Sequence, residues 1–151
     1  MLLTNEFLLN PRILEDVQIL VVENDCDSRE LYAILLENQG ATVTTSGSIQ
    51  DALSFLDWGV PDLLICEIRF LGESVYPLLQ RIKSLRITGR TIPILVTSTC
   101  SPISLTQQLM VKVEAYLLKP IDIDDFVHQV WDLLLPSVRL VRKSEIVSSS
   151  C

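Results

Sequence analysis

Four short apolar runs each end at polar residues, and this pattern constrains the fold more than any other feature of the chain. The runs are rich in Ile, Val and Leu, which is typical of strands covered on both faces of a parallel sheet. Ligand sites in such sheets lie beyond the carboxyl ends of the strands, so we expect the polar endings to meet in space. The runs and their endings are Ile19–Val22 before Glu23-Asn24-Asp25, Leu63–Cys66 before Glu67, Ile94–Val96 before Thr97-Ser98, and Tyr116–Leu118 before Lys119-Pro120.

The length and hydropathy favour one cytoplasmic domain. A chain of 151 residues can bury a core without disulfides or a structural metal. Its mean hydropathy of +0.37 is high, but no apolar stretch is long enough to cross a bilayer, and the N-terminus lacks the marks of a secretory signal. We expect no membrane partner, a domain over residues 17–135, an N-terminal extension over 1–16 and a C-terminal tail over 136–151.

The charge and the cysteines exclude further classes of protein. A net charge of -7 does not suit a phosphate backbone, so we expect no nucleic-acid partner. The basic residues of the tail are interpreted as a solvated end. The cysteines form no Cys-x-x-Cys pair, which argues against zinc and thioredoxin-like sites and favours reduced thiols. Cys26 and Cys100 are expected in loops at the carboxyl edge, where a redox role is the less favoured alternative; the other two cysteines are Cys66 and Cys151.

Helical segments alternate with the strands, which predicts an α/β fold with right-handed crossovers. Asp27 is expected to cap the first helix and Gly40 to end it, before an edge strand over 41–45. Ser48 is expected to open the second helix, which ends at Gly59.

Three later helices are expected. One spans Ser74 to Ile87, with Pro77 in its first turn. The next covers residues 103–113 and has only a weak apolar stripe. The final helix follows Asp122, ends before Pro136, and carries His128 as an ordinary surface residue.

In order and spacing, these motifs resemble the receiver domain of two-component response regulators. That family has acidic residues after strand one, an acceptor Asp after strand three, Thr or Ser after strand four and Lys-Pro after strand five. Thirty residues separate Glu67 from Thr97, and twenty-two separate Thr97 from Lys119, similar to the family's spacing. The resemblance covers residues 17–135 and implies a flavodoxin-like, doubly wound sheet of five parallel strands in the order 2-1-3-4-5.

The resemblance also implies phosphoryl transfer to a carboxylate, assisted by Mg²⁺ and a Lys. Glu67 stands at the phosphoacceptor position, and Glu23, Asn24 and Glu67 stand at the metal positions. Because Asn24 replaces an Asp and carries no charge, Mg²⁺ binding is expected to be weak or absent. Thr97, Tyr116 and Lys119 occupy the switch and phosphate-contact positions.

The acceptor position and the loop after it depart from the family. Glu extends about 1.5 Å further than Asp, and a misplacement of ~1 Å can cost on the order of a hundredfold in rate. We therefore expect slow or absent phosphorylation, and Glu67 could instead pair with Lys119 and bias the domain toward an activated-like state. The family's Met-Pro-Gly appears here as Phe70-Leu71-Gly72, so the stiffening Pro is missing.

These departures favour a stand-alone receiver-like module that acts by protein–protein contact, with a histidine kinase or a downstream signalling protein as partner. The alternative is a working receiver that takes phosphate from a histidine kinase. An enzyme is not expected, since no Gly-rich phosphate loop or nucleophile elbow is present. A homodimer through the fourth and fifth expected helices is conceivable, although core packing explains Val130, Trp131 and Leu134 equally well. Taken singly, each pocket residue could be a helix cap, a loop contact or a surface side chain.

Overall fold

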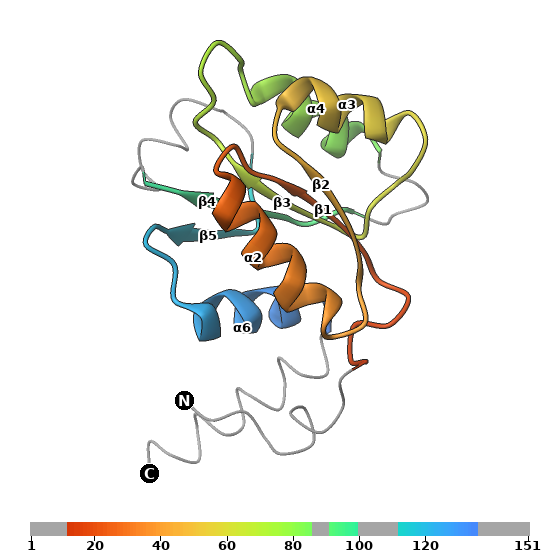
Figure 1. Ribbon diagram of the computed structural model, residues 1–151. Helices are drawn as coiled ribbons and strands as arrows, with labels where there is room; N and C mark the ends of the chain where they lie inside the picture. The colour runs from red at the N-terminus through yellow and green to blue at the C-terminus, as the bar shows by residue number, and fades with distance from the viewer. Residues whose placement is uncertain (1–11, 86–90, 100–111, 136–151) are drawn as a thin grey trace.

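Five parallel strands form a single sheet in the order β2-β1-β3-β4-β5 (Figure 1). The computed structural model describes residues 12–85, 91–99 and 112–135. The predicted fold class and strand order are confirmed. The observed edge strand begins and ends one residue later than the predicted 41–45. The strands are β1 (Gln18–Val22), β2 (Thr42–Ser46), β3 (Leu63–Glu67), β4 (Ile94–Ser98) and β5 (Ala115–Leu118).

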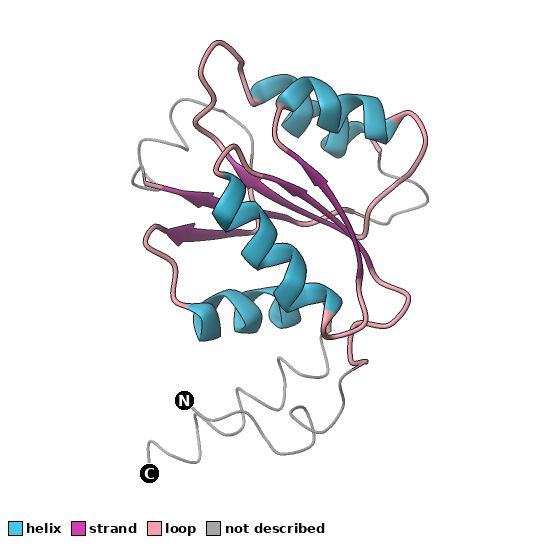
Figure 2. Ribbon diagram, in the orientation of Figure 1, coloured by secondary structure: helices cyan, strands magenta, loops and turns pink. Residues whose placement is uncertain are grey.

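Helices cover both faces of the sheet, which explains why its central strands are apolar without alternation (Figure 2). The described helices are α2 (Cys26–Glu37), α3 (Ile49–Leu56), α4 (Tyr76–Ser84) and α6 (Ile123–Leu134). Alternate strand residues point to opposite faces. One core cluster joins Leu20, Leu64 and Val96 to α3 and α4. The other joins Val21, Ile65 and Leu95 to α2 and α6.

The first two helices begin at polar caps. Asp25, rather than the predicted Asp27, caps α2, because its carboxylate accepts the Ser28 amide hydrogen at 3.0 Å. Cys26 is consequently the first residue of a helix and does not lie in a loop as predicted. Gly40 adopts a φ of +97°, as expected of a residue that ends a helix. Ser48 caps α3 as predicted, accepting the Asp51 amide hydrogen at 3.1 Å.

The later helices agree with prediction in part. α4 begins at Tyr76, two residues after the predicted Ser74, and Pro77 lies in its first turn. The Ser74 hydroxyl accepts the Tyr76 amide hydrogen at 3.2 Å, so Ser74 lies outside the helix. α6 starts and ends where predicted, with Asp122 as its cap. Residues 100–111, which hold most of the helix expected over 103–113 and also Cys100, lie outside the described residues, as does Cys151.

His128 is not a surface residue. Its side chain is 7% exposed, and its ring centroid lies 6.2 Å from that of Trp131, one helical turn later. The prediction was wrong because the apolar side of α6 is wide enough to include position 128. Val130 and Trp131 are likewise buried in the core. Those two side chains therefore serve core packing, and the predicted homodimer receives no support from their burial.

Candidate functional site

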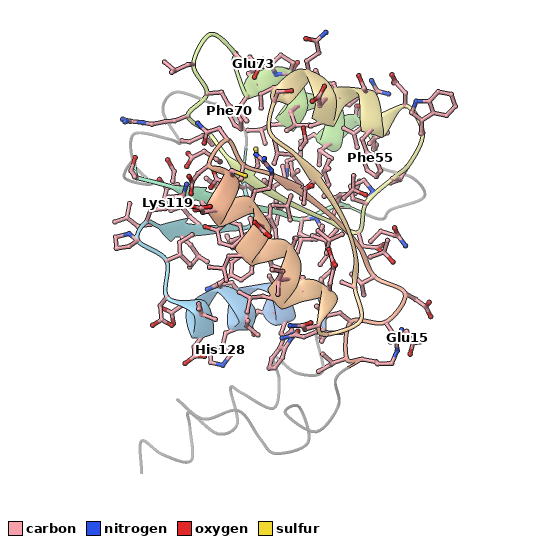
Figure 3. All side chains as sticks on the ribbon, viewed as in Figure 1. Glu15, Phe55, Phe70, Glu73, Lys119 and His128 are labelled. Atoms are coloured by element: carbon pink, nitrogen blue, oxygen red, sulfur yellow. The ribbon has the colours of Figure 1, made fainter. Side chains whose placement is uncertain are left out.

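The carboxyl ends of β1, β3 and β5 bring three charged side chains together. Glu23 follows the last residue of β1, Glu67 is the last residue of β3, and Lys119 follows the last residue of β5. β1 pairs with β3, and β4 lies between β3 and β5, so all three side chains come from one edge of the sheet. Figure 3 shows Lys119 at this edge, beside the start of α2. The predicted convergence is therefore present in the structure.

Lys119 bridges the two glutamates. Its Nζ lies 2.6 Å from Oε1 of Glu23 and 2.7 Å from Oε2 of Glu67. The side chains are 1% exposed for Glu23, 5% for Glu67 and 19% for Lys119. Charges this far from water are stable only when they are paired and hydrogen-bonded. One ammonium group thus holds two buried carboxylates at the centre of the site.

The remaining carboxylate oxygens are also engaged. Oε1 of Glu67 accepts hydrogen bonds from the backbone amides of Ile68 at 2.8 Å and Arg69 at 3.0 Å. Oε2 of Glu23 accepts one from the Asp25 amide at 3.1 Å. All four carboxylate oxygens of the two glutamates therefore have a donor from the chain itself. This degree of satisfaction is what a buried charged cluster requires.

Burial and pairing act on the Lys119 pKa in opposite directions. Burial lowers the pKa, but the hydrogen bonds and negative charges of Glu23 and Glu67 outweigh it and raise the pKa above its ordinary value of 10.5. The ammonium form is therefore favoured in the folded protein. The same cluster affects Cys66, one residue before Glu67: burial, followed by the two carboxylates, raises the pKa of this thiol well above its ordinary value of 9.0.

Asn24 and Asp25 both use their side chains inside the chain. The Asn24 amide nitrogen donates to the carbonyl oxygen of Arg69 at 3.0 Å, so Asn24 contacts the loop after β3. The carboxylate of Asp25 caps α2, and the hydrogen bond from the Ser28 side chain is the main cause that lowers its pKa. Arg29 fixes the backbone at Glu23 by donating to its carbonyl oxygen at 2.7 Å.

Thr97 lies beside Glu67 but does not join the cluster. The two residues are register partners in the pairing of β3 with β4. Thr97 is 1% exposed, and among the described residues its hydroxyl has no hydrogen-bond partner. Tyr116, on β5, is partly buried and packs against the core cluster of α3 and α4. The structure thus places Thr97 on the strand next to Glu67, and Tyr116 one strand further away, where it pairs with Val96 of β4.

Comparison with known proteins identifies the family. The family model described as "Response regulator receiver domain" matches residues 19–131. This chain belongs to the response regulator receiver family. It is 33% identical over 110 residues to the "Uncharacterized 14.6 kDa protein in sodA1 3'region" of Leptolyngbya boryana, covering 72% of this chain and 83% of that one. It is 32% identical over 123 residues to the "Regulator of RpoS" of Escherichia coli K12.

The receiver fold accounts for only part of some relatives. The match to the Regulator of RpoS covers 80% of this chain but 36% of that protein. Among solved structures, a two-component response regulator from Clostridium difficile superposes with a TM-score of 0.70 at 21% identity, covering 79% of this chain and 96% of that one. This likeness supports the fold. Receiver domains are signalling modules and generally not enzymes.

Receiver domains typically bind Mg²⁺, and the donor set of this receiver can be tested against that ion. Mg²⁺ requires oxygen ligands in near-octahedral geometry. Here the oxygens of Glu23 and Glu67 accept from Lys119 and from backbone amides, and Asn24 directs an N–H group at the neighbouring carbonyl. Within the described ranges, no group of three or more His, Cys, Asp or Glu side chains is arranged to hold a metal. The residues present therefore fit Mg²⁺ poorly in this arrangement.

Two features of this receiver were not predicted. The Arg29 contact to the Glu23 backbone leaves no pattern in the sequence. The carboxylate of Glu73, in the loop after β3, accepts from the first two amides of α3. The missing Pro at position 71 indicated an altered loop, but not this contact.

No helix among the described residues is both long and apolar enough to span a membrane.

Proposed function

We propose that this chain is a receiver module that signals by protein–protein contact and is not phosphorylated in the ordinary way. The observation that carries the proposal is the buried ion pair between Glu67 and Lys119, at 2.7 Å. Phosphoryl transfer depends mostly on positioning and on neutralisation of the phosphoryl charge. In this receiver, the lysine that would supply such neutralisation already holds the carboxylates of Glu23 and Glu67.

The length of the Glu67 side chain supports the same proposal. With one carbon more than Asp, its carboxylate lies about 1.5 Å further out, where an incoming phosphoryl group would have to sit. Its two oxygens take up Lys119 and the amides of Ile68 and Arg69. We infer that Glu67 fills the pocket itself. Since the Thr97 hydroxyl is not engaged by Glu67, an activated-like state would be only partly imitated.

The proposal includes weak or absent Mg²⁺ binding. A metal ion at this edge would have to displace Lys119 from two carboxylates or compete with the Asn24 amide at the Arg69 carbonyl. Lys119 already supplies positive charge between the carboxylates. Glu23, Asn24 and Glu67 would therefore make contacts within the chain instead of binding a metal ion.

The remaining parts of the proposal concern setting and partners. We propose a cytoplasmic, non-enzymatic module whose partner is a histidine kinase or a downstream signalling protein. A homodimer through α6 and the helix expected over residues 103–113 remains a prediction. Cys26, an exposed free thiol, has no role in the proposal.

A second candidate function is acceptance of phosphate from a histidine kinase at Glu67. It is favoured by one observation: Thr97, buried beside Glu67, has a hydroxyl with no hydrogen-bond partner among the described residues. Such a hydroxyl is available to a phosphoryl oxygen. Acceptance would require Glu67 to release Lys119, which is costly because the two buried groups form an ion pair at 2.7 Å.

The test is incubation of the purified chain with Mg²⁺ and acetyl phosphate, followed by intact-mass analysis. We expect no phosphoryl adduct on the wild-type protein and slow accumulation of one on the Glu67→Asp variant, whose shorter side chain reopens the pocket. The double variant Asn24→Asp/Glu67→Asp should accept phosphate faster than the single one. A stoichiometric adduct mapped to Glu67 in the wild type would contradict the proposal and establish the second candidate.

A further inference from the structure

The loop that follows β3 is fastened to α3 by the carboxylate of Glu73. Its Oε2 accepts the Ile49 amide hydrogen at 3.2 Å, and its Oε1 accepts the Gln50 amide hydrogen at 3.2 Å. These are the first two residues of α3, whose amides have no partner within the helix. The positive end of the helix dipole also favours a carboxylate there. Figure 3 shows Glu73 beside the start of α3.

Two further contacts fix the same loop closer to the pocket. The Asn24 side chain donates to the Arg69 carbonyl at 3.0 Å. Phe70 and Glu73 form an antiparallel bridge, which Gly72 permits by adopting a φ of +75°. Phe70 also packs against the core cluster of α3 and α4. The loop is thus held at Arg69, at Phe70 and at Glu73.

The contacts that hold this loop also affect the amides that bind Glu67. The amides of Ile68 and Arg69, which hold Oε1 of Glu67, lie between the end of β3 and the bridged turn. Their direction is set by the path of the backbone up to Phe70. Since position 71 is Leu, the ring of a Pro cannot stiffen this path. A contact from the far side of the turn can stiffen the path in place of that ring.

We propose that Glu73 is a positioning residue for the pocket: by holding the start of α3, it keeps the Ile68 and Arg69 amides directed at the carboxylate of residue 67. This inference deepens the proposed function, since it names what keeps Glu67 bound in its own pocket. A simpler role for Glu73 is that of a second cap for α3, which would stabilise that helix alone. The chain offers a matched control, because Ser48 caps the same helix without touching the loop.

The experiment is amide hydrogen exchange followed by NMR in wild type, Glu73→Ala and Ser48→Ala. In Glu73→Ala we expect exchange at Ile68 and Arg69 to accelerate by about tenfold or more beyond any change in the β1 amides, which report global stability. In Ser48→Ala we expect faster exchange at Asp51 and no selective change at Ile68 or Arg69. Glu73→Gln, which keeps one carbonyl acceptor, should lie between wild type and Glu73→Ala.

The inference is overturned if Glu73→Ala leaves exchange at Ile68 and Arg69 unchanged relative to β1. It is equally overturned if Ser48→Ala accelerates those two amides as much as Glu73→Ala does. Should Glu73→Ala fail to fold, the same criteria apply to Glu73→Gln. Exchange is measured on the unphosphorylated protein, so a phosphoryl adduct on wild-type Glu67 in the separate acetyl phosphate assay would defeat the proposed function without overturning this inference, and the two failures can be told apart.

Discussion

The ends of β3 and β4 lie side by side and are both buried, yet the polar side chains there differ in whether they have hydrogen-bond partners. Glu67 at the end of β3 is 4% exposed, and both of its carboxylate oxygens have donors from the chain. Thr97, one residue before the end of β4, is 1% exposed, and its hydroxyl has no partner among the described residues. The two are register partners, so distance along the sheet does not explain the contrast.

The difference indicates which half of the pocket is closed. In the charged half, made of Glu23, Glu67 and Lys119, every carboxylate oxygen has a donor. In the other half, the Thr97 hydroxyl is free to form a hydrogen bond with a ligand. A chain that had lost all need for its pocket would not be expected to retain a buried hydroxyl with no hydrogen-bond partner among the described residues, because such a group destabilises the folded state. The account therefore predicts opposite effects when the two halves are altered.

The largest effect is expected from Lys119→Met. It leaves Glu23 and Glu67 buried without their shared ammonium, which should lower the free energy of unfolding by about 3–5 kcal/mol at neutral pH. Urea denaturation followed by circular dichroism measures this. The control is Arg81→Met, whose ion pair with Asp57 is exposed (39% and 61%) and should matter by no more than about 1 kcal/mol. Similar small losses in both variants would contradict the closed pocket.

A smaller loss is expected from Glu67→Gln. The variant removes the charge-assisted hydrogen bond to Lys119, for about 1.5–3 kcal/mol, while Lys119 keeps its contact with Glu23. The amide oxygen of Gln can still accept from Ile68 and Arg69. The same denaturation assay applies, and a variant as stable as wild type would show that the Glu67–Lys119 contact contributes nothing.

The surroundings of Cys66 should make the free energy of unfolding depend on pH under alkaline conditions. The pKa of Cys66 is raised, first by burial and then by Glu67 and Glu23. The folded state therefore favours the protonated thiol, and this contribution is fully present below the thiol's ordinary pKa of 9.0. As the pH rises above that value, stability should fall by up to about 1.4 kcal/mol per pH unit. Cys66→Ala should flatten the slope between pH 9 and 10; an unchanged slope would assign the loss to other groups.

The smallest effect is expected from Thr97→Val, and its sign is opposite. Replacing an unpartnered buried hydroxyl with a methyl group of the same shape should leave stability unchanged or raise it by up to about 1 kcal/mol. The matched control is Ser46→Ala, since the buried Ser46 hydroxyl donates to the Ser48 carbonyl at 2.7 Å and its loss should destabilise. Destabilisation by Thr97→Val would reveal a partner for Thr97 and remove the contrast with Glu67.

The sequence was sufficient to predict the meeting of Glu23, Glu67 and Lys119. Each of these residues follows an apolar run or ends one, and parallel strands deliver their carboxyl ends to a single edge. The pairing of Glu67 with Lys119 was expected from side-chain length. The starts of the helices were predicted less well. Ser48 as a cap and the start of α6 after Asp122 were correct, but Asp25 took the place of Asp27 as the cap of α2, because the choice between these two residues does not alter the pattern of apolar residues in the helix.

Other features depend on the path of the chain in space. The Glu73 carboxylate reaches amides more than twenty residues earlier in the sequence, a contact that only the folded loop brings about. The state of the Thr97 hydroxyl depends on which neighbours approach within hydrogen-bond distance. The burial of His128 depends on the width of the packed side of α6. Residue spacing carries no information on these three points.

A double-mutant cycle tests the central claim, that Glu67 occupies the pocket by pairing with Lys119, most directly. The free energies of unfolding of wild type, Glu67→Gln, Lys119→Met and the double variant give the coupling between the two side chains. The account predicts a favourable coupling of about 1–3 kcal/mol, with Glu67→Gln becoming neutral or stabilising once Lys119 is absent. Additive losses, equal to within about 0.5 kcal/mol, would show that the pair does not hold the pocket closed.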